Sequence, residues 1–158
     1  MSLLEACKWL EASWLGTAIR ESKWGFALIE MVHLLALALL GGALLITGLR
    51  VWGFLFKEQR PGAITRDLGW LLVGSFAAML VSGILLFADG PLRYFGNAAF
   101  RVKLLLIVGA ATTGLLTHLL GVRGQIGQSA STVMKAMALL SCTLWLGAGI
   151  AGRVIGVL

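Results

Sequence analysis

The chain has 158 residues, of which 59% are hydrophobic and 13% are charged, and its mean hydropathy is +0.93. This composition excludes a soluble globular protein, and the length suits one domain, so we expect a single all-α integral membrane domain over residues 1–158. The net charge of +6 does not indicate nucleic-acid binding, because the Lys and Arg residues flank apolar runs and form no basic stripe. The partner that this composition predicts is the lipid bilayer.

The N-terminal segment, residues 2–19, has an apolar face that includes Cys7 and Trp14 and a charged face with Glu5, Lys8 and Glu11. This pattern is typical of an amphipathic helix that lies on the membrane surface. No small-residue cleavage site follows it, so we do not expect a secretory signal peptide. Cys7 lacks any CxxC or Cys/His spacing, as does Cys142, and both are expected to be free thiols.

Four apolar stretches are long enough to cross a bilayer: residues 24–50, 68–88, 102–122 and 132–155. The loops between them are short, which predicts an antiparallel four-transmembrane bundle with both termini on one side. Residues 91–100 are too short to span and are expected in the headgroup region. Ser75, Ala78 and Ser82 form a small, weakly polar stripe that would allow close helix packing. Basic residues cluster most tightly in the 50–66 loop, which favours a cytoplasmic location for that loop and an external one for the termini.

The first span carries Glu30 and His33, although an ionisable group at this depth costs roughly 2.5 kcal/mol or more without a partner. The two residues are three apart, so they are expected to point toward one neighbouring helix, with Gly41 and Gly48 continuing that face. Glu30 has two readings. It is a ligand or proton acceptor beside His33, or it pairs with Arg153 or Lys103, and we favour the ion pair.

His33 and His118 are the only histidines, and both fall within spans. A neutral imidazole can ligate haem iron or copper, but it can also simply hydrogen-bond to a neighbouring helix. Residue counting places the two rings roughly 8 Å apart in depth, so one iron held by both would need shifted or tilted helices. Glycines 41, 48, 149, 152 and 156 would admit a flat cofactor, yet packing contacts explain them more often.

A set of aromatic, glycine and polar positions over nearly the whole chain resembles an uncharacterised bacterial inner-membrane family, a domain of unknown function. The residues that carry the resemblance are Arg20, Ser22, Trp24, Glu30, His33, Gly41, Leu49, Arg50, Gly53, Gly83, Phe87, Tyr94, Asn97, Phe100, Lys103, His118, Trp145, Gly152 and Arg153. Thr113 departs from the Asn expected in that family. The chain is more distantly similar to copper-resistance D proteins and to small four-helix b-type cytochromes. The resemblance implies a four-helix architecture in the inner membrane, with the external termini in the periplasm.

The leading functional hypothesis is a haem b protein that transfers electrons in the membrane, with His33 and His118 as axial ligands and Arg153 and Lys103 as propionate partners. Its partner would be another redox protein or a quinone, and a homo-oligomer is also compatible with the sequence. The second hypothesis is copper or other metal handling through His33, His118 and Glu30, although the chain lacks dense Met or Cys arrays. The third is a non-catalytic accessory subunit. An enzyme is the weakest class, because no nucleophile–base pair or HExxH spacing is present.

Overall fold

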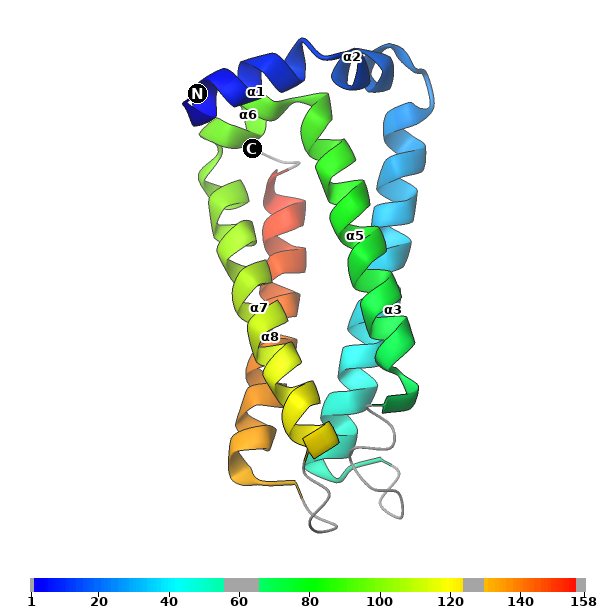
Figure 1. The fold of residues 1–158 in the computed structure, drawn as a ribbon, viewed down its shortest axis with the longest axis vertical. Coiled ribbons are helices and arrows are strands. Elements are labelled where there is room, and N and C mark those ends of the chain that lie inside the picture. Colours follow the sequence, from blue (N-terminus) through cyan, green and yellow to red (C-terminus); the bar gives the residue numbers. More distant parts are fainter. Residues whose placement is uncertain (1, 56–65, 124–129, 156–158) are drawn as a thin grey trace.

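The computed structural model describes residues 2–55, 66–123 and 130–155, with only the backbone described for residues 121–123. Four long helices run side by side along the molecule (Figure 1): α3 (Gly25–Trp52), α5 (Gly69–Asp89), α7 (Ala98–Arg123) and α8 (Thr132–Ile155). Each contains a stretch long and apolar enough to cross a membrane. The predicted all-α, multi-pass membrane architecture is confirmed, and the start of α1 and the end of α8 lie at the same end of the bundle.

The predicted span boundaries agree with the helices to within about four residues. The largest shift is at α7, which begins at Ala98 and not at 102, because the Asn97 side chain accepts a hydrogen bond from the Ala99 amide (2.9 Å) and caps the helix. The preceding residues form a short helix, α6 (Pro91–Gly96), at the same end of the molecule as the N-terminal segment. The basic loop used to predict orientation falls mostly in 56–65, outside the described residues.

The N-terminal segment consists of two helices, α1 (Leu3–Glu11) and α2 (Trp14–Glu21), which lie across the end of the bundle (Figure 1). The prediction of one helix over residues 2–19 was therefore wrong. The Ser13 hydroxyl accepts from the Gly16 amide and starts a second helix. A β-carbon on Gly16 would lie 2.8 Å from the Ala88 carbonyl oxygen, so only glycine lets α2 approach α5 this closely.

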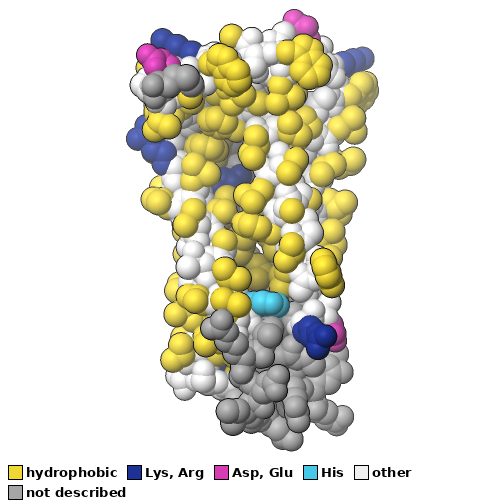
Figure 2. Space-filling view, viewed as in Figure 1, with side chains coloured by type: hydrophobic (Ala, Val, Ile, Leu, Met, Phe, Trp, Pro, Cys, Tyr) yellow, Lys and Arg dark blue, Asp and Glu magenta, His cyan; other side chains and the backbone are white. Residues whose placement is uncertain are grey.

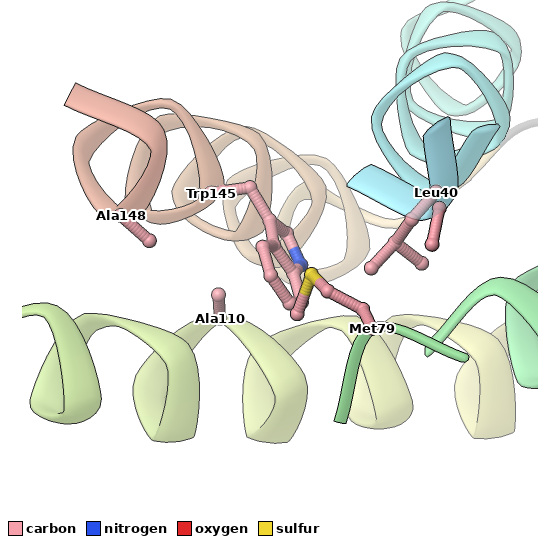
Figure 3. Close-up of a cluster of buried hydrophobic side chains, with 6 residues drawn as sticks. Leu40, Met79, Ala110, Trp145 and Ala148 are labelled. Carbon is pink, nitrogen blue, oxygen red and sulfur yellow. The ribbon is translucent and has the colours of Figure 1, made fainter. Parts of the chain in front are cut away.

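The long helices pack as two pairs, α3 with α5 and α7 with α8, and α3 also packs against α8. An apolar layer forms where the pairs meet (Figure 3), and it consists of Ala36, Leu40, Met79, Ala110, Trp145 and Ala148. The Trp145 ring fills this layer and meets Phe76 edge to face, with ring centroids 6.1 Å apart. Trp145 is 7% exposed and is therefore a core residue.

Polar side chains lie on both sides of this apolar layer, and on α3 and α7 they are one heptad away from it. His33, Leu40 and Thr47 follow one another at seven-residue spacing on α3, and Lys103, Ala110 and Thr117 do so on α7. Seven residues are nearly two full turns, so each set faces the same way. The bundle thus has an upper polar level near α1 and α2, an apolar middle, and a lower polar level. The upper level contains His33, Ser82 and Lys103; the lower level contains Thr47, Thr117, His118, Ser141 and Cys142.

Candidate cofactor site

The upper polar level is centred on a hydrogen bond between two helices. Nδ1 of His33 on α3 lies 2.9 Å from the Ser82 hydroxyl on α5. Gly83 makes room for the ring, because a β-carbon there would lie 3.3 Å from Cε1 of His33. The stripe predicted from Ser75, Ala78 and Ser82 does allow α3 and α5 to pack closely, and Ser82 also serves as the partner of the histidine.

The hydrogen bonds around Ser82 assign the tautomer of His33. The Ser82 hydroxyl donates to the Ala78 carbonyl oxygen at 2.6 Å, and a hydroxyl has only one proton. We therefore assign Ser82 as the acceptor of the Nδ1 proton of His33. In the neutral ring this leaves the lone pair on Nε2, the nitrogen that ligates metals when Nδ1 is held by a partner.

Glu30 does not join His33. The inward line of α3 passes through His33, Ala36 and Leu40, and one turn earlier it passes through Ile29. Glu30 is one residue beyond Ile29, so it is rotated by about 100° and its side chain is exposed. The predicted ion pair with Lys103 or Arg153 was wrong, since neither cation pairs with Glu30 and Arg153 is itself exposed. Glu30 is only five residues from the start of α3, about 8 Å, so its carboxylate can reach the membrane surface.

Lys103 extends from α7 into the upper polar level. Its Nζ lies 3.2 Å from the position a β-carbon would take on Gly152 of α8, so the side chain crosses over that glycine. Its ammonium is also near enough to His33 to interact electrostatically with the ring. Figure 2 shows Lys and Arg side chains mainly toward the two ends of the molecule, with some of their atoms recessed between apolar side chains in the upper half. Lys103 therefore brings a positive charge to the same polar level as the imidazole.

The two histidines lie at different levels. Cε1 of His118 is 3.7 Å from the β-carbon position of Gly69, whereas His33 is beside Gly83 on the same helix. The 14 residues between these glycines correspond to ~21 Å along α5. The predicted depth difference of about 8 Å was too small. It was obtained by counting residues inward from opposite ends of a ~30 Å membrane core, whereas α3 and α7, with 28 and 26 residues, are longer than that core. His33 and His118 do not share one site.

His118 instead lines a small cavity of about 20 Å³ in the lower polar level. Its polar lining comes from three helices: Thr47 of α3, Thr117 and His118 of α7, and Ser141 and Cys142 of α8. This cluster was not predicted from the sequence. Its signal was that Thr47 and Thr117 lie two heptads after His33 and Lys103 on α3 and α7, and the helices must be brought into register before that spacing places the two threonines together.

The glycines divide into two groups. A β-carbon on Gly48 would meet the Cys142 sulfur at 3.3 Å, so this glycine is a packing contact, as is Gly152 beneath Lys103. Gly41 and Gly149 have nothing within 4 Å at that position and line a lipid-facing groove of about 470 Å³ between α3 and α8. The groove is almost wholly apolar, and its upper end, Leu37, is one turn below His33.

A family model described as "Family of unknown function (DUF6644)" matches residues 6–158. The chain belongs to the DUF6644 family. No curated protein and no solved structure matches it. The expected membership of an uncharacterised four-helix membrane family is thereby confirmed, while the more distant similarity to copper-resistance D proteins and b-type cytochromes stays a prediction.

The donor set of this DUF6644 protein limits what it can hold. Among residues 2–55, 66–120 and 130–155, no three His, Cys, Asp or Glu side chains lie close enough to surround one metal ion. The upper level supplies one imidazole nitrogen and one ammonium group, and the lower level supplies hydroxyl oxygens around His118. The first arrangement suits a cofactor that brings its own equatorial ligands and an anionic group.

Proposed function

We propose that this protein is an intramembrane haem b-binding protein that transfers electrons, with His33 as its protein ligand. The observation that carries the proposal is the 2.9 Å hydrogen bond between Nδ1 of His33 and the Ser82 hydroxyl, because acceptance by Ser82 would put the lone pair of the neutral ring on Nε2. A hydrogen bond of this kind fixes the orientation of a ligating imidazole and raises its basicity.

Lys103 supports the same proposal. A lysine ammonium within a membrane bundle is costly without an opposite charge. No acidic side chain among the described residues pairs with it, and Glu30, the nearest predicted candidate, faces outward. Haem b carries two propionates, and an ammonium beside the ligating imidazole would bind one of them. Arg153 is exposed near the end of α8, so it is a partner for an anionic group at the membrane surface only.

The donor set is compatible with haem held by His33 alone, and it does not fit haem held by His33 and His118 together, because ~21 Å separates the two levels along α5. When bound, haem would supply one-electron chemistry. The protein's part is to present Nε2 of His33, to orient that ring through Ser82, to neutralise an anionic group with Lys103, and to exclude water with the apolar layer around Trp145.

The test is an absorbance spectrum of protein purified in mild detergent from haem-replete cells. We expect a Soret band in the wild type and in His118→Ala, and its loss in His33→Ala. The comparison of His33→Ala with His118→Ala separates the loss of an iron ligand from the general effect of removing an intramembrane imidazole. A wild-type protein without a Soret band, or one whose band depends on His118 and not on His33, contradicts the proposal.

Copper handling and an accessory role have no observation of their own in their favour. Copper would need further donors beside His33, and Glu30 points away from it. Metal analysis of the wild type and His33→Ala tests that alternative. A quinone or redox protein as electron partner, and a homo-oligomer, are further parts of the hypothesis that native purification and cross-linking would examine.

The cellular placement is also part of the proposal. We infer a bacterial inner membrane with both termini in the periplasm, from the family resemblance and the basic residues of the 50–66 loop. Reporter fusions to the C-terminus test it: an alkaline phosphatase fusion should be active and a fluorescent protein fusion dark. The reverse pattern would place the termini in the cytoplasm.

A further inference from the structure

The lower cavity has a lining that accepts hydrogen bonds. The hydroxyl of Thr47 donates to the Ala43 carbonyl oxygen at 2.8 Å, and that of Thr117 donates to Thr113 at the same distance. Both bonds run back along the same helix, and each uses the single proton of the hydroxyl. The oxygen lone pairs remain for whatever occupies the cavity.

Two side chains of α8 also donate their single proton to a backbone carbonyl oxygen, but the carbonyl belongs to a neighbouring helix. The Ser141 hydroxyl donates to the Ala110 carbonyl oxygen of α7 at 3.1 Å, and the Cys142 thiol donates to the Leu44 carbonyl oxygen of α3 at 3.7 Å. Ser141 is almost fully buried, with 2% of its surface exposed, and Thr117 and Thr47 are 4% and 6% exposed. Three buried hydroxyl oxygens from three helices therefore surround one small space, and none has a proton left to donate into it.

We propose that this cavity binds one water molecule, which donates its protons to these hydroxyl oxygens and links α3, α7 and α8 at the level of His118. The volume of about 20 Å³ exceeds the ~10–15 Å³ that one water needs and leaves no room for a larger ligand. Polar cavities that offer two to four partners are hydrated, whereas cavities lined by apolar side chains stay dry.

A metal cation is the competing occupant, since oxygen atoms also coordinate Na⁺. Among the described residues, the cavity lining includes no carboxylate that would neutralise a cation at this depth. Water carries no charge and has two protons for these acceptors. It can also accept a proton from the ring of His118, which lines the cavity and forms no hydrogen bond with another described residue. His118 then has a structural role that is independent of cofactor binding at His33.

The experiment is NMR on cofactor-free protein in lipid nanodiscs, with magnetisation transferred from water to the side chains around the cavity. In the wild type we expect transfer to Thr117, Ser141 and the His118 ring, with opposite NOE and ROE signs, which mark a bound water and not proton exchange. Thr117→Val keeps the side-chain shape and removes one acceptor, so the transfer to Ser141 and His118 should fall at least severalfold.

Thr112→Val is the matched control. Thr112 is on the same helix and donates to Val108 at the same 2.8 Å, but it is exposed on the outer surface. This variant should leave the transfer unchanged. If Thr117→Val does not fold, Ser141→Ala replaces it, and the wild-type measurement decides the main point by itself.

Two results would overturn the inference. One is the absence of water transfer to these residues in the wild type. The other is a saturable shift of the Thr117 and Ser141 signals when choline is replaced by Na⁺, which would make the cavity a cation site. Neither result depends on a Soret band, so the failure of this inference and the failure of haem binding at His33 can be told apart.

Discussion

The upper and lower polar levels occupy equivalent heptad positions of the same bundle, yet they differ in what they leave unsatisfied. In the lower level each hydroxyl donates to a backbone carbonyl, and the remaining acceptors surround a space the size of one water. In the upper level Nδ1 of His33 bonds to Ser82, and Lys103 adds a positive charge that no acidic side chain among the described residues neutralises. Polar groups that satisfy one another stabilise helix packing, whereas an unmatched base and cation are suited to a ligand.

The largest expected effect concerns the apolar layer that separates the two levels. Trp145→Ala removes the largest side chain of this layer and its edge-to-face contact with Phe76. We expect a loss of about 3–5 kcal/mol in the free energy of unfolding. Reversible unfolding in mixed micelles would measure it. Trp70→Ala is the control, because Trp70 is 88% exposed and its replacement should change the free energy far less. Equal losses in the two variants would mean that the levels are not separated by a packed core.

The next prediction concerns the hydrogen bond that distinguishes the upper level. Ser82→Ala removes the hydroxyl that bonds to Nδ1 of His33, so the free energy of unfolding should fall by about 1–3 kcal/mol, measured by the same unfolding titration. Ser75→Ala is a close control, one heptad away on α5, because the Ser75 hydroxyl bonds only to carbonyls of its own helix. If haem is bound, Ser82→Ala should also weaken its affinity by about 10–100-fold. A loss as large in Ser75→Ala would contradict the role assigned to Ser82.

Lys103→Met tests the unmatched charge. Methionine is apolar and of similar length, so the cofactor-free protein should be as stable as the wild type or more stable by about 1 kcal/mol. Thermal denaturation with and without added haem would measure both stabilities, and the stabilisation by haem should be smaller in the variant than in the wild type. A clear loss of stability in the cofactor-free variant would reveal a protein partner for the ammonium.

The smallest effect is expected at Glu30. Because this side chain is exposed on α3 and forms no ion pair with Lys103 or Arg153, Glu30→Gln should change the free energy of unfolding by less than about 0.5 kcal/mol. It should also leave any Soret band unchanged, in contrast to His33→Ala. A Glu30→Gln variant that loses the band would return Glu30 to the cofactor site.

Much of the architecture was predictable because it depends on local properties. Runs of apolar residues long enough to cross a bilayer, and the short loops between them, predicted four antiparallel helices in a membrane and termini at one end. The break between α1 and α2 was missed although its signal is local. Ser13 is a favourable N-cap residue for α2, and the close approach of Gly16 to Ala88 stabilises the turn in the folded protein.

The sequence by itself determined the class of protein, the number of spans and the presence of two costly imidazoles among them. The tertiary structure decided which polar groups meet, because the rotation and axial register of each helix depend on how its neighbours pack. A rotation of about 100° separates Glu30 from the inward line of α3. The packing of α3 on α5 pairs His33 with Ser82, and the register of α7 takes His118 to the opposite level, where polar residues of α3, α7 and α8 line the same cavity.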